Sequence, residues 1–244
     1  MIARIVLILC AAALAACQTG TPGATLRTEQ AFVQTTPLTL QVRSDHCFLS
    51  RTSGGPVDTR IWQVYGESVA GIADLVAIIA NCAEIAGAND GFGQSVKSIG
   101  LVYVRLKDGT RQRLHGVTRA AYIDALVRAA SAGTLLDDST SEENLQRTLE
   151  IMRKFGARPV YGEVDGTRTT LVEHDHAGVI VRQESTRTRN FSEKTELTII
   201  GFTLVDGWPV TVEYSVNAGV DAEIVALDVV KSVLLGLAGE AGTI

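Results

Sequence analysis

The chain has little positive charge and few cysteines. Lys and Arg together number 22 against 27 Asp and Glu, so the formal net charge is -5. Such a surface is not built to attract phosphate backbones, which excludes nucleic acid as an expected partner. Four cysteines in 244 residues exclude a cysteine-dense scaffold, and a 46% apolar share excludes a disordered or collagen-like chain. The length suits one large or two small globular domains.

The motifs of several enzyme classes are also absent. The chain has no Gly-x-Ser-x-Gly, and residues 66–71 miss that spacing by one residue. It has no phosphate-binding Gly-x-x-x-x-Gly-Lys-Ser/Thr, and the segment 91–93 lacks the third glycine of a dinucleotide-binding loop. No Cys-x-x-Cys is present either. We therefore expect no cofactor, and we expect a binding protein rather than an enzyme.

The N-terminus has the pattern of an export signal. One positive charge, Arg4, precedes an unbroken apolar run from Ile5 to Ala16. At 1.5 Å per residue this run spans only about 18 Å as a helix, whereas the hydrocarbon core of a bilayer is roughly 30 Å thick. The run is therefore predicted to be the core of a signal peptide covering residues 1–16.

The signal ends in Leu14-Ala15-Ala16-Cys17, which resembles the lipobox of bacterial lipoproteins. In that family a dedicated peptidase cuts before the cysteine once its thiol is diacylated. The resemblance implies that Cys17 is the first mature residue and carries the lipid, with palmitate-type acyl chains as the membrane anchor. Gln18 stands where an Asp would favour the inner membrane, so the resemblance implies the outer membrane, facing the periplasm. An ordinary signal cut at an Ala-x-Ala site, with Cys17 as a spare thiol, is the alternative.

The remaining cysteines are expected to pair. If Cys10 leaves with the signal and Cys17 is lipidated, Cys47 and Cys82 remain as an even pair in an oxidising compartment. This arithmetic predicts a structural disulfide. The alternative is a redox-active or metal-binding pair.

Residues 17–36 are rich in Thr, Gly and Gln and are expected to form a flexible tether. Residues 37–244 then read as a single α+β domain, with one antiparallel sheet on which two central helices and a C-terminal amphipathic helix pack. The order of helix, β meander and C-terminal helix resembles that of PsbP-like domains, which also occur in bacterial lipoproteins. That resemblance implies a binding or assembly module.

Hydrophobic periodicity predicts the elements of this domain. A short helix from Asp58 or Thr59, then a strand over 75–80 that brings Cys82 to Cys47, is preferred to one long helix over 58–87. The final helix, 222–238, is expected to turn Ile224, Leu227, Val230 and Leu234 inward. The other expected helices are 118–132 and 140–155, and the other expected strands are 37–50, 99–106, 111–114, 160–164, 169–172, 177–182, 197–205 and 209–216.

One local cluster has the residue types of a metal site. In the segment 173–176, His174 and His176 would project from the same face if the backbone is extended. Two imidazoles at this spacing can bind a divalent ion, with His115 or His46 as a third ligand. A solvated polar turn is the competing interpretation. Ser44, Asp45 and His46 also bring acid and base types together beside Cys47.

Three functions remain open from the sequence. The first is a non-catalytic binding or scaffolding lipoprotein, attached to the membrane through its lipid and meeting an envelope protein or a small ligand. The second is a small-ligand carrier with an apolar cavity between Phe202, Trp208 and the last helix. The third is a metal-dependent hydrolase that uses His174 and His176.

Overall fold

The computed structural model describes residues 25–91, 96–135, 163–189, 192–217 and 220–239. The signal segment, Cys17 and the helix expected over 140–155 lie outside these ranges. The described helices are α2 (Pro56–Ser68), α3 (Cys82–Asn89), α4 (Arg119–Ser131) and α6 (Val220–Ala238). The strands are β1 (Leu26–Val33), β2 (Thr36–Arg43), β3 (His46–Phe48), β4 (Ala73–Asn81), β5 (Ile99–Lys107), β6 (Thr110–Arg111), β7 (Glu163–His174), β8 (Val179–Arg189), β9 (Ser192–Val205) and β10 (Trp208–Asn217).

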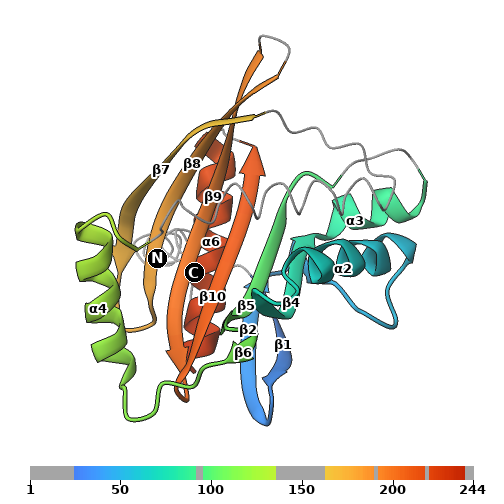
Figure 1. Ribbon diagram of the computed structural model, residues 1–244. Helices are drawn as coiled ribbons and strands as arrows, with labels where there is room; N and C mark the ends of the chain where they lie inside the picture. The colour runs from blue at the N-terminus through green and yellow to red at the C-terminus, as the bar shows by residue number, and fades with distance from the viewer. Residues whose placement is uncertain (1–24, 92–95, 136–162, 190–191, 218–219, 240–244) are drawn as a thin grey trace, which may run out of the picture.

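The fold is α+β and is built on a large antiparallel sheet, as predicted (Figure 1). Seven strands follow the order β3-β4-β5-β10-β9-β8-β7, β6 adds to β5, and β1 with β2 form a separate hairpin. Two tight turns at Asp-Gly pairs explain the hairpins β5–β6 and β9–β10. Asp108 and Gly109 have φ of 52° and 71°, and Asp206 and Gly207 have φ of 48° and 81°. These left-handed angles suit an Asp-Gly pair.

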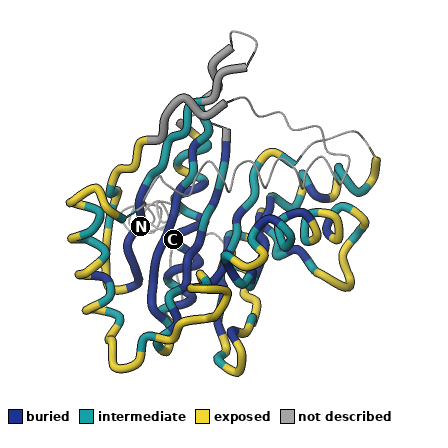
Figure 2. Tube along the Cα trace, viewed as in Figure 1, coloured by how far each residue is buried: buried dark blue, intermediate teal, exposed yellow. Residues whose placement is uncertain are grey.

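The two faces of the sheet bury different elements. One face packs against α6 and the β1–β2 hairpin and forms the largest core cluster. The opposite face is covered by α2 and α3 over β3–β5 and by α4 over β7–β9. In Figure 1, α6 lies behind the strands, α4 lies beside β7 at one edge of the sheet, and α2 and α3 lie near β4 toward the other edge. Figure 2 shows the central strands as mostly buried. Among the described helices, none is long and apolar enough to span a bilayer.

Glycines bring α6 close to its neighbours. A Cβ added at Gly236 would lie 2.9 Å from the Thr39 carbonyl oxygen and 3.0 Å from the Gln41 nitrogen, both backbone atoms of β2. A Cβ added at Gly201 of β9 would lie 2.6 Å from Val230 Cγ1 on α6. Contacts under about 3 Å to backbone atoms cannot be relieved by a side-chain rotation. The hairpin and the sheet therefore sit against α6 at a spacing that only glycine permits.

Local predictions were confirmed in several places. Thr118 caps α4, its hydroxyl accepting from the Ala121 N–H at 3.2 Å. The stretch 58–87 divides into a helix and a strand, as preferred, but α2 begins at Pro56 with Gly55 as its N-cap. Proline at the first helical position costs no hydrogen bond, which explains this earlier start. The sequence did not predict α3, which follows directly after β4.

The tether and the start of the last helix differ from the predictions. The flexible tether expected over 17–36 does not extend through Leu26–Val33, because these residues form β1 and pair with β2. Ile224, expected to face inward, has 55% of its surface exposed, whereas Val230 and Leu234 are buried as predicted and Leu227 is half-buried against the core. Glu223 nearby pairs with Arg182, so this side of the first turn of α6 carries a polar contact, while Ala222 and Val225 pack against the core.

A pair of glycine substitutions tests the close approach of α6. Gly236→Ala is expected to lower the free energy of unfolding by about 1–3 kcal/mol, because the added methyl meets the β2 backbone. Gly66→Ala in α2 is the matched control. It has open space around its Cβ position, and we expect it to be neutral or stabilising by up to about 1 kcal/mol. Urea unfolding measures both, and equal effects of the two variants would contradict the packing described.

Candidate functional site

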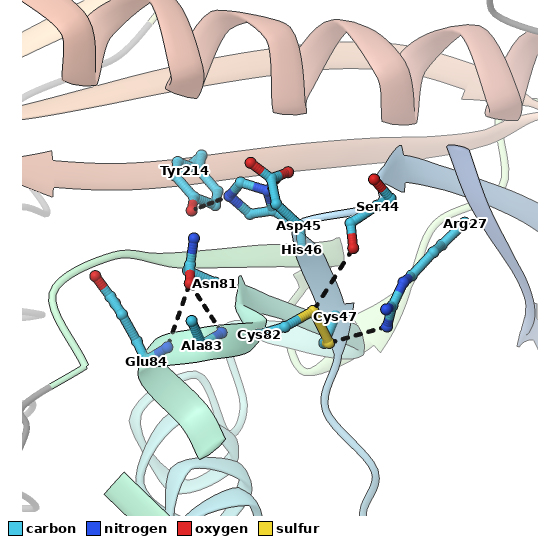
Figure 3. Close-up of a disulfide and its surroundings, with 10 residues drawn as sticks. All are labelled: Arg27, Ser44, Asp45, His46, Cys47, Asn81, Cys82, Ala83, Glu84 and Tyr214. Atoms are coloured by element: carbon cyan, nitrogen blue, oxygen red, sulfur yellow. Dashed lines mark hydrogen bonds and ion pairs between the residues drawn. A yellow bond between two sulfur atoms is a disulfide. The ribbon is translucent and has the colours of Figure 1, made fainter. Parts of the chain in front are cut away.

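The predicted disulfide joins the edge of the sheet to the start of a helix. Cys47 lies on β3, which pairs with β4, and Cys82 is the first residue of α3. The two Cα atoms are 5.2 Å apart and the sulfurs are bonded, which confirms the predicted pairing of Cys47 with Cys82 (Figure 3). Closing a loop with a sequence separation of 35 residues stabilises a fold by about 4 kcal/mol in the chain-entropy model.

The surroundings of the two sulfurs differ. Arg27 of β1 donates a hydrogen bond from Nη1 to Cys47 Sγ at 3.1 Å. On the other side, Asn81 caps α3, its side-chain oxygen accepting from the N–H groups of Ala83 and Glu84 at 3.0 and 3.2 Å. Cys47 Sγ therefore faces a cation. Next to Cys82, the N–H groups at the start of α3 already bond to the side-chain oxygen of Asn81.

His46, the residue before Cys47, is fully enclosed. It has 1% of its surface exposed, its Nδ1 lies 2.8 Å from Asp45 Oδ1, and its Nε2 lies 2.8 Å from the Tyr214 hydroxyl. The two rings meet edge to face (Figure 3). Both imidazole nitrogens therefore have protein partners, and neither is left to act on a substrate.

Tyr214 reaches His46 by crossing β5. It lies on β10 directly opposite Gly100, and a Cβ added at Gly100 would be 2.7 Å from Tyr214 Cδ2. The ring thus occupies the space that a side chain on β5 would take. Its hydroxyl donates to Ser98 Oγ at 3.1 Å. Burial raises the pKa of Tyr214 to about 12, against a smaller lowering by the Ser98 hydrogen bond.

Charged residues continue the network to α6. Arg43 contacts Asp45 through Nη2 and Asp228 of α6 through Nη1, each at 3.2 Å. Partial burial alone would raise the pKa of Asp45, but the hydrogen bonds and charges of His46 and Arg43 together lower it below its ordinary value of 3.8. Asp45 and Arg43 together therefore link the buried histidine to the last helix.

A second polar pair lies on the opposite face of the sheet. Sequence reasoning missed it, and the only signal for it was a lone carboxylate in an apolar strand. The Tyr103 hydroxyl donates to Glu213 Oε1 in a short hydrogen bond between β5 and β10. Burial raises the pKa of Glu213, although the Tyr103 hydrogen bond and the charge of Arg105 oppose the shift. Burial and the Glu213 charge raise the pKa of Tyr103 well above its ordinary value. The pair holds two polar groups in a mostly apolar layer.

The predicted metal residues lie on an exposed turn. His174 ends β7, His176 follows it, and both side chains are exposed, as is His115. Asp175 between the two histidines accepts from the backbone N–H groups of Ala177 and Gly178 at 2.8 and 3.2 Å, the arrangement of an Asx turn. In the part of the chain that the structure describes, no three His, Cys, Asp or Glu side chains are grouped to hold a metal ion. The predicted pair therefore has no third ligand there.

The apolar cavity predicted between Phe202, Trp208 and the last helix is not formed by these residues. Phe202 packs with α4 on one face of the sheet, and Trp208 packs in the α6 core on the other, so the two rings cannot border one cavity. The hollow beside Glu173, Gly178 and Lys231 has a volume of about 10 Å³. That volume holds one water molecule and no larger ligand.

No protein-family model matches the chain, and no curated protein matches it in sequence. The interpretation of this site therefore depends on its own geometry.

The charged link at Asp45 predicts a dependence of stability on pH. Because its pKa is lowered in the folded state, Asp45 contributes stability above pH 3.8, and this contribution is lost as pH falls through the lower folded pKa. Asp45→Asn keeps an acceptor for His46 but removes the charge. We expect the variant to be less stable at pH 7 by about 0.5–1 kcal/mol, a range set by the partial exposure of the ion pair, and the difference to vanish near pH 2.

The measurement is urea unfolding of both proteins between pH 2 and pH 7. Asp124→Asn, an exposed carboxylate on α4, is the control and should show no pH-dependent difference. A constant difference for Asp45→Asn across this range would contradict the assignment.

Proposed function

We propose that the chain is an exported lipoprotein, held by acyl chains on Cys17 at the outer membrane and facing the periplasm. Its α+β domain would be a non-catalytic binding or scaffolding module. The observation that carries the anchoring is the apolar run that ends in Leu14-Ala15-Ala16-Cys17. Acyl chains bind a bilayer at about 0.8 kcal/mol per buried CH₂, so two or more chains give stable attachment.

The disulfide supports export. Structural disulfides persist in oxidising compartments such as the periplasm and are rare in the cytosol. Cys47 and Cys82 are the two cysteines left after the signal and the lipid carrier are set aside, and they are bonded to each other. The proposed signal and lipid site therefore agree with the bonded state of the other two cysteines.

The placement of the histidines and the large aromatic residues supports a binding module over a metal-dependent hydrolase or a small-ligand carrier. His46 is enclosed with both nitrogens occupied, and His174 and His176 are exposed on a turn. Phe202 and Trp208 lie on opposite faces of a filled sheet. A hydrolase needs a polar group open to substrate and a carrier needs a cavity. A module that binds through its surface needs neither.

The edge of the sheet at β7 is the surface we assign to an envelope protein. Among the described strands β7 pairs with β8 alone, and its register is regular from Gly166 to Leu171, between two bulges. The opposite edge, β3, has three residues and is linked to α3 by the disulfide. A free and regular strand edge can accept an extended peptide through backbone hydrogen bonds.

Fatty-acid labelling tests the anchor. The wild-type chain and the control Cys10→Ser, expressed in a Gram-negative host, are expected to incorporate an alkyne-tagged fatty acid and to fractionate with the outer membrane. Cys17→Ser should lose the label completely. An unlabelled wild-type protein, or label that persists in Cys17→Ser, would contradict the proposed lipid site.

Photo-crosslinking in cells tests the binding edge. A photoreactive amino acid is placed at Thr169, exposed on β7, and in a matched protein at Thr59, exposed on α2. We expect Thr169 to give a defined adduct with one envelope protein, because its strand edge is the proposed contact, and Thr59 to give none. The same adduct from both positions, or none from Thr169, would show that β7 is not the binding edge.

A further inference from the structure

We propose that the Cys47–Cys82 disulfide is exchangeable and that a dithiol reductant opens it, with Arg27 stabilising Cys47 as the leaving thiolate. The reacting partner is a protein or small molecule that carries two thiols. The proposal goes beyond a structural disulfide and does not depend on the lipid anchor.

The position of Arg27 is the first observation. Its guanidinium donates to Cys47 Sγ at 3.1 Å, and within the described residues it forms no ion pair with a carboxylate. A disulfide sulfur is neutral and a weak acceptor, so it compensates the charge of Arg27 poorly. A thiolate at the same place would form a full ion pair. Arg27 therefore favours the state in which Cys47 is reduced and charged.

Among the described residues, no cation is placed beside the second sulfur as Arg27 is beside the first. Cys82 begins α3, but the first free N–H groups of that helix bond to Asn81, and Glu84 adds a carboxylate to the same turn. The Ser44 carbonyl oxygen lies 4.0 Å from Cys82 Sγ, and it would not stabilise an anion there. Of the two sulfurs, Cys47 is the better leaving group, because the cation beside it stabilises the departing thiolate.

A reductant can reach this bond. Arg27, Ser44 and Asp45 are exposed, and both cysteines are only half-buried. The exposed turn between β2 and β3, which contains Ser44 and Asp45, lies beside Cys82. This arrangement separates the disulfide from His46, which occupies the interior on the other side of the same strand.

The exchange takes place in two steps. A thiolate of the dithiol attacks Cys82 Sγ, a new S–S bond forms there, and the Cys47–Cys82 bond breaks with its electron pair on Cys47 Sγ beside Arg27. The second thiolate of the dithiol then attacks the other sulfur of the dithiol, which is bonded to Cys82 Sγ. This closes the reductant's disulfide and releases Cys82 as a thiolate. The dithiol loses two electrons and becomes a disulfide, and Cys47 with Cys82 gains them and takes up protons from water as the pH requires.

The local fold does not rely on the covalent bond alone. The Cys82 N–H donates to the Asp45 carbonyl oxygen at 2.9 Å, and His46 opposite Asn81 keeps β3 paired with β4. His46 also remains held by Tyr214. The two sulfurs would therefore stay close after reduction, which is the condition for the bond to reform.

The rate of reduction tests the role of Arg27. The full chain carrying Cys10→Ser and Cys17→Ser, in mild detergent, has Cys47 and Cys82 as its only cysteines. Dithiothreitol is added at pH 7, samples are quenched with acid, and free thiols are counted by the gel shift of a maleimide polymer. Arg27→Gln should slow reduction by about 3- to 10-fold, because the leaving thiolate loses its cation.

Two further variants separate charge at this place from charge in general. Arg27→Lys keeps the cation and should stay within about twofold of the parent rate. Lys107→Gln removes an exposed cation from the β5–β6 hairpin and should leave the rate unchanged. Loss of the fold would expose the disulfide and speed its reduction, so a misfolded Arg27→Gln gives the opposite sign. Equal rates for Arg27→Gln and the parent, or an equal effect of Lys107→Gln, would overturn the proposal.

The direction of attack has its own readout. With the monothiol 2-mercaptoethanol the mixed disulfide lasts longer, because a second molecule must attack it; acid quenching at early times traps it, and peptide mass mapping locates the adduct. We expect the adduct on Cys82, with Cys47 as the free thiol. An adduct mainly on Cys47 would overturn the assignment of the leaving group.

Discussion

The close packing of α6 against both the sheet and the β1–β2 hairpin is the constraint on which the rest of the structure depends. Gly236 and Gly201 remove the side chains that would keep the helix away, and the residues of α6 that face inward complete the largest core cluster. This packing places Asp228 beside Arg43, and Arg43 in turn holds Asp45 next to the buried His46. The short strand β3 and its disulfide are therefore fixed by a chain of contacts that begins at the last helix.

Much of the fold could be predicted from local sequence, because its signals are local. Alternating apolar residues marked the strands, Asp-Gly pairs marked two hairpins, and cysteine arithmetic gave Cys47 with Cys82. The strand Leu26–Val33 was missed because its composition is that of a linker, and only its pairing with β2 makes it a strand. The site was harder to predict. Tyr214 meets His46 across 168 residues of sequence, and the space it needs comes from Gly100 on a third strand.

The fold gives the histidines that the sequence suggested for catalysis or metal binding other surroundings than predicted. His46 stands beside an acid in the sequence, but in the fold it is enclosed between Asp45 and Tyr214, and both ring nitrogens have protein partners. His174 and His176 looked like ligands, and they lie on a turn shaped by Asp175. The chemistry that stays accessible is at the sulfurs, where Arg27 faces Cys47. A surface-binding lipoprotein with an accessible disulfide is the account that uses each of these placements.

One measurement tests this account most directly: a native mass spectrum, and then a denatured one, of the wild-type protein extracted in detergent from the outer membrane. The account predicts a chain that begins at Cys17 and carries acyl chains. It also predicts the mass deficit of one disulfide, and no metal ion or small molecule that is lost on denaturation. An unacylated chain would contradict the anchor. A stoichiometric ion or small molecule in the native spectrum alone would contradict the binding module and restore the carrier or the metal-dependent enzyme.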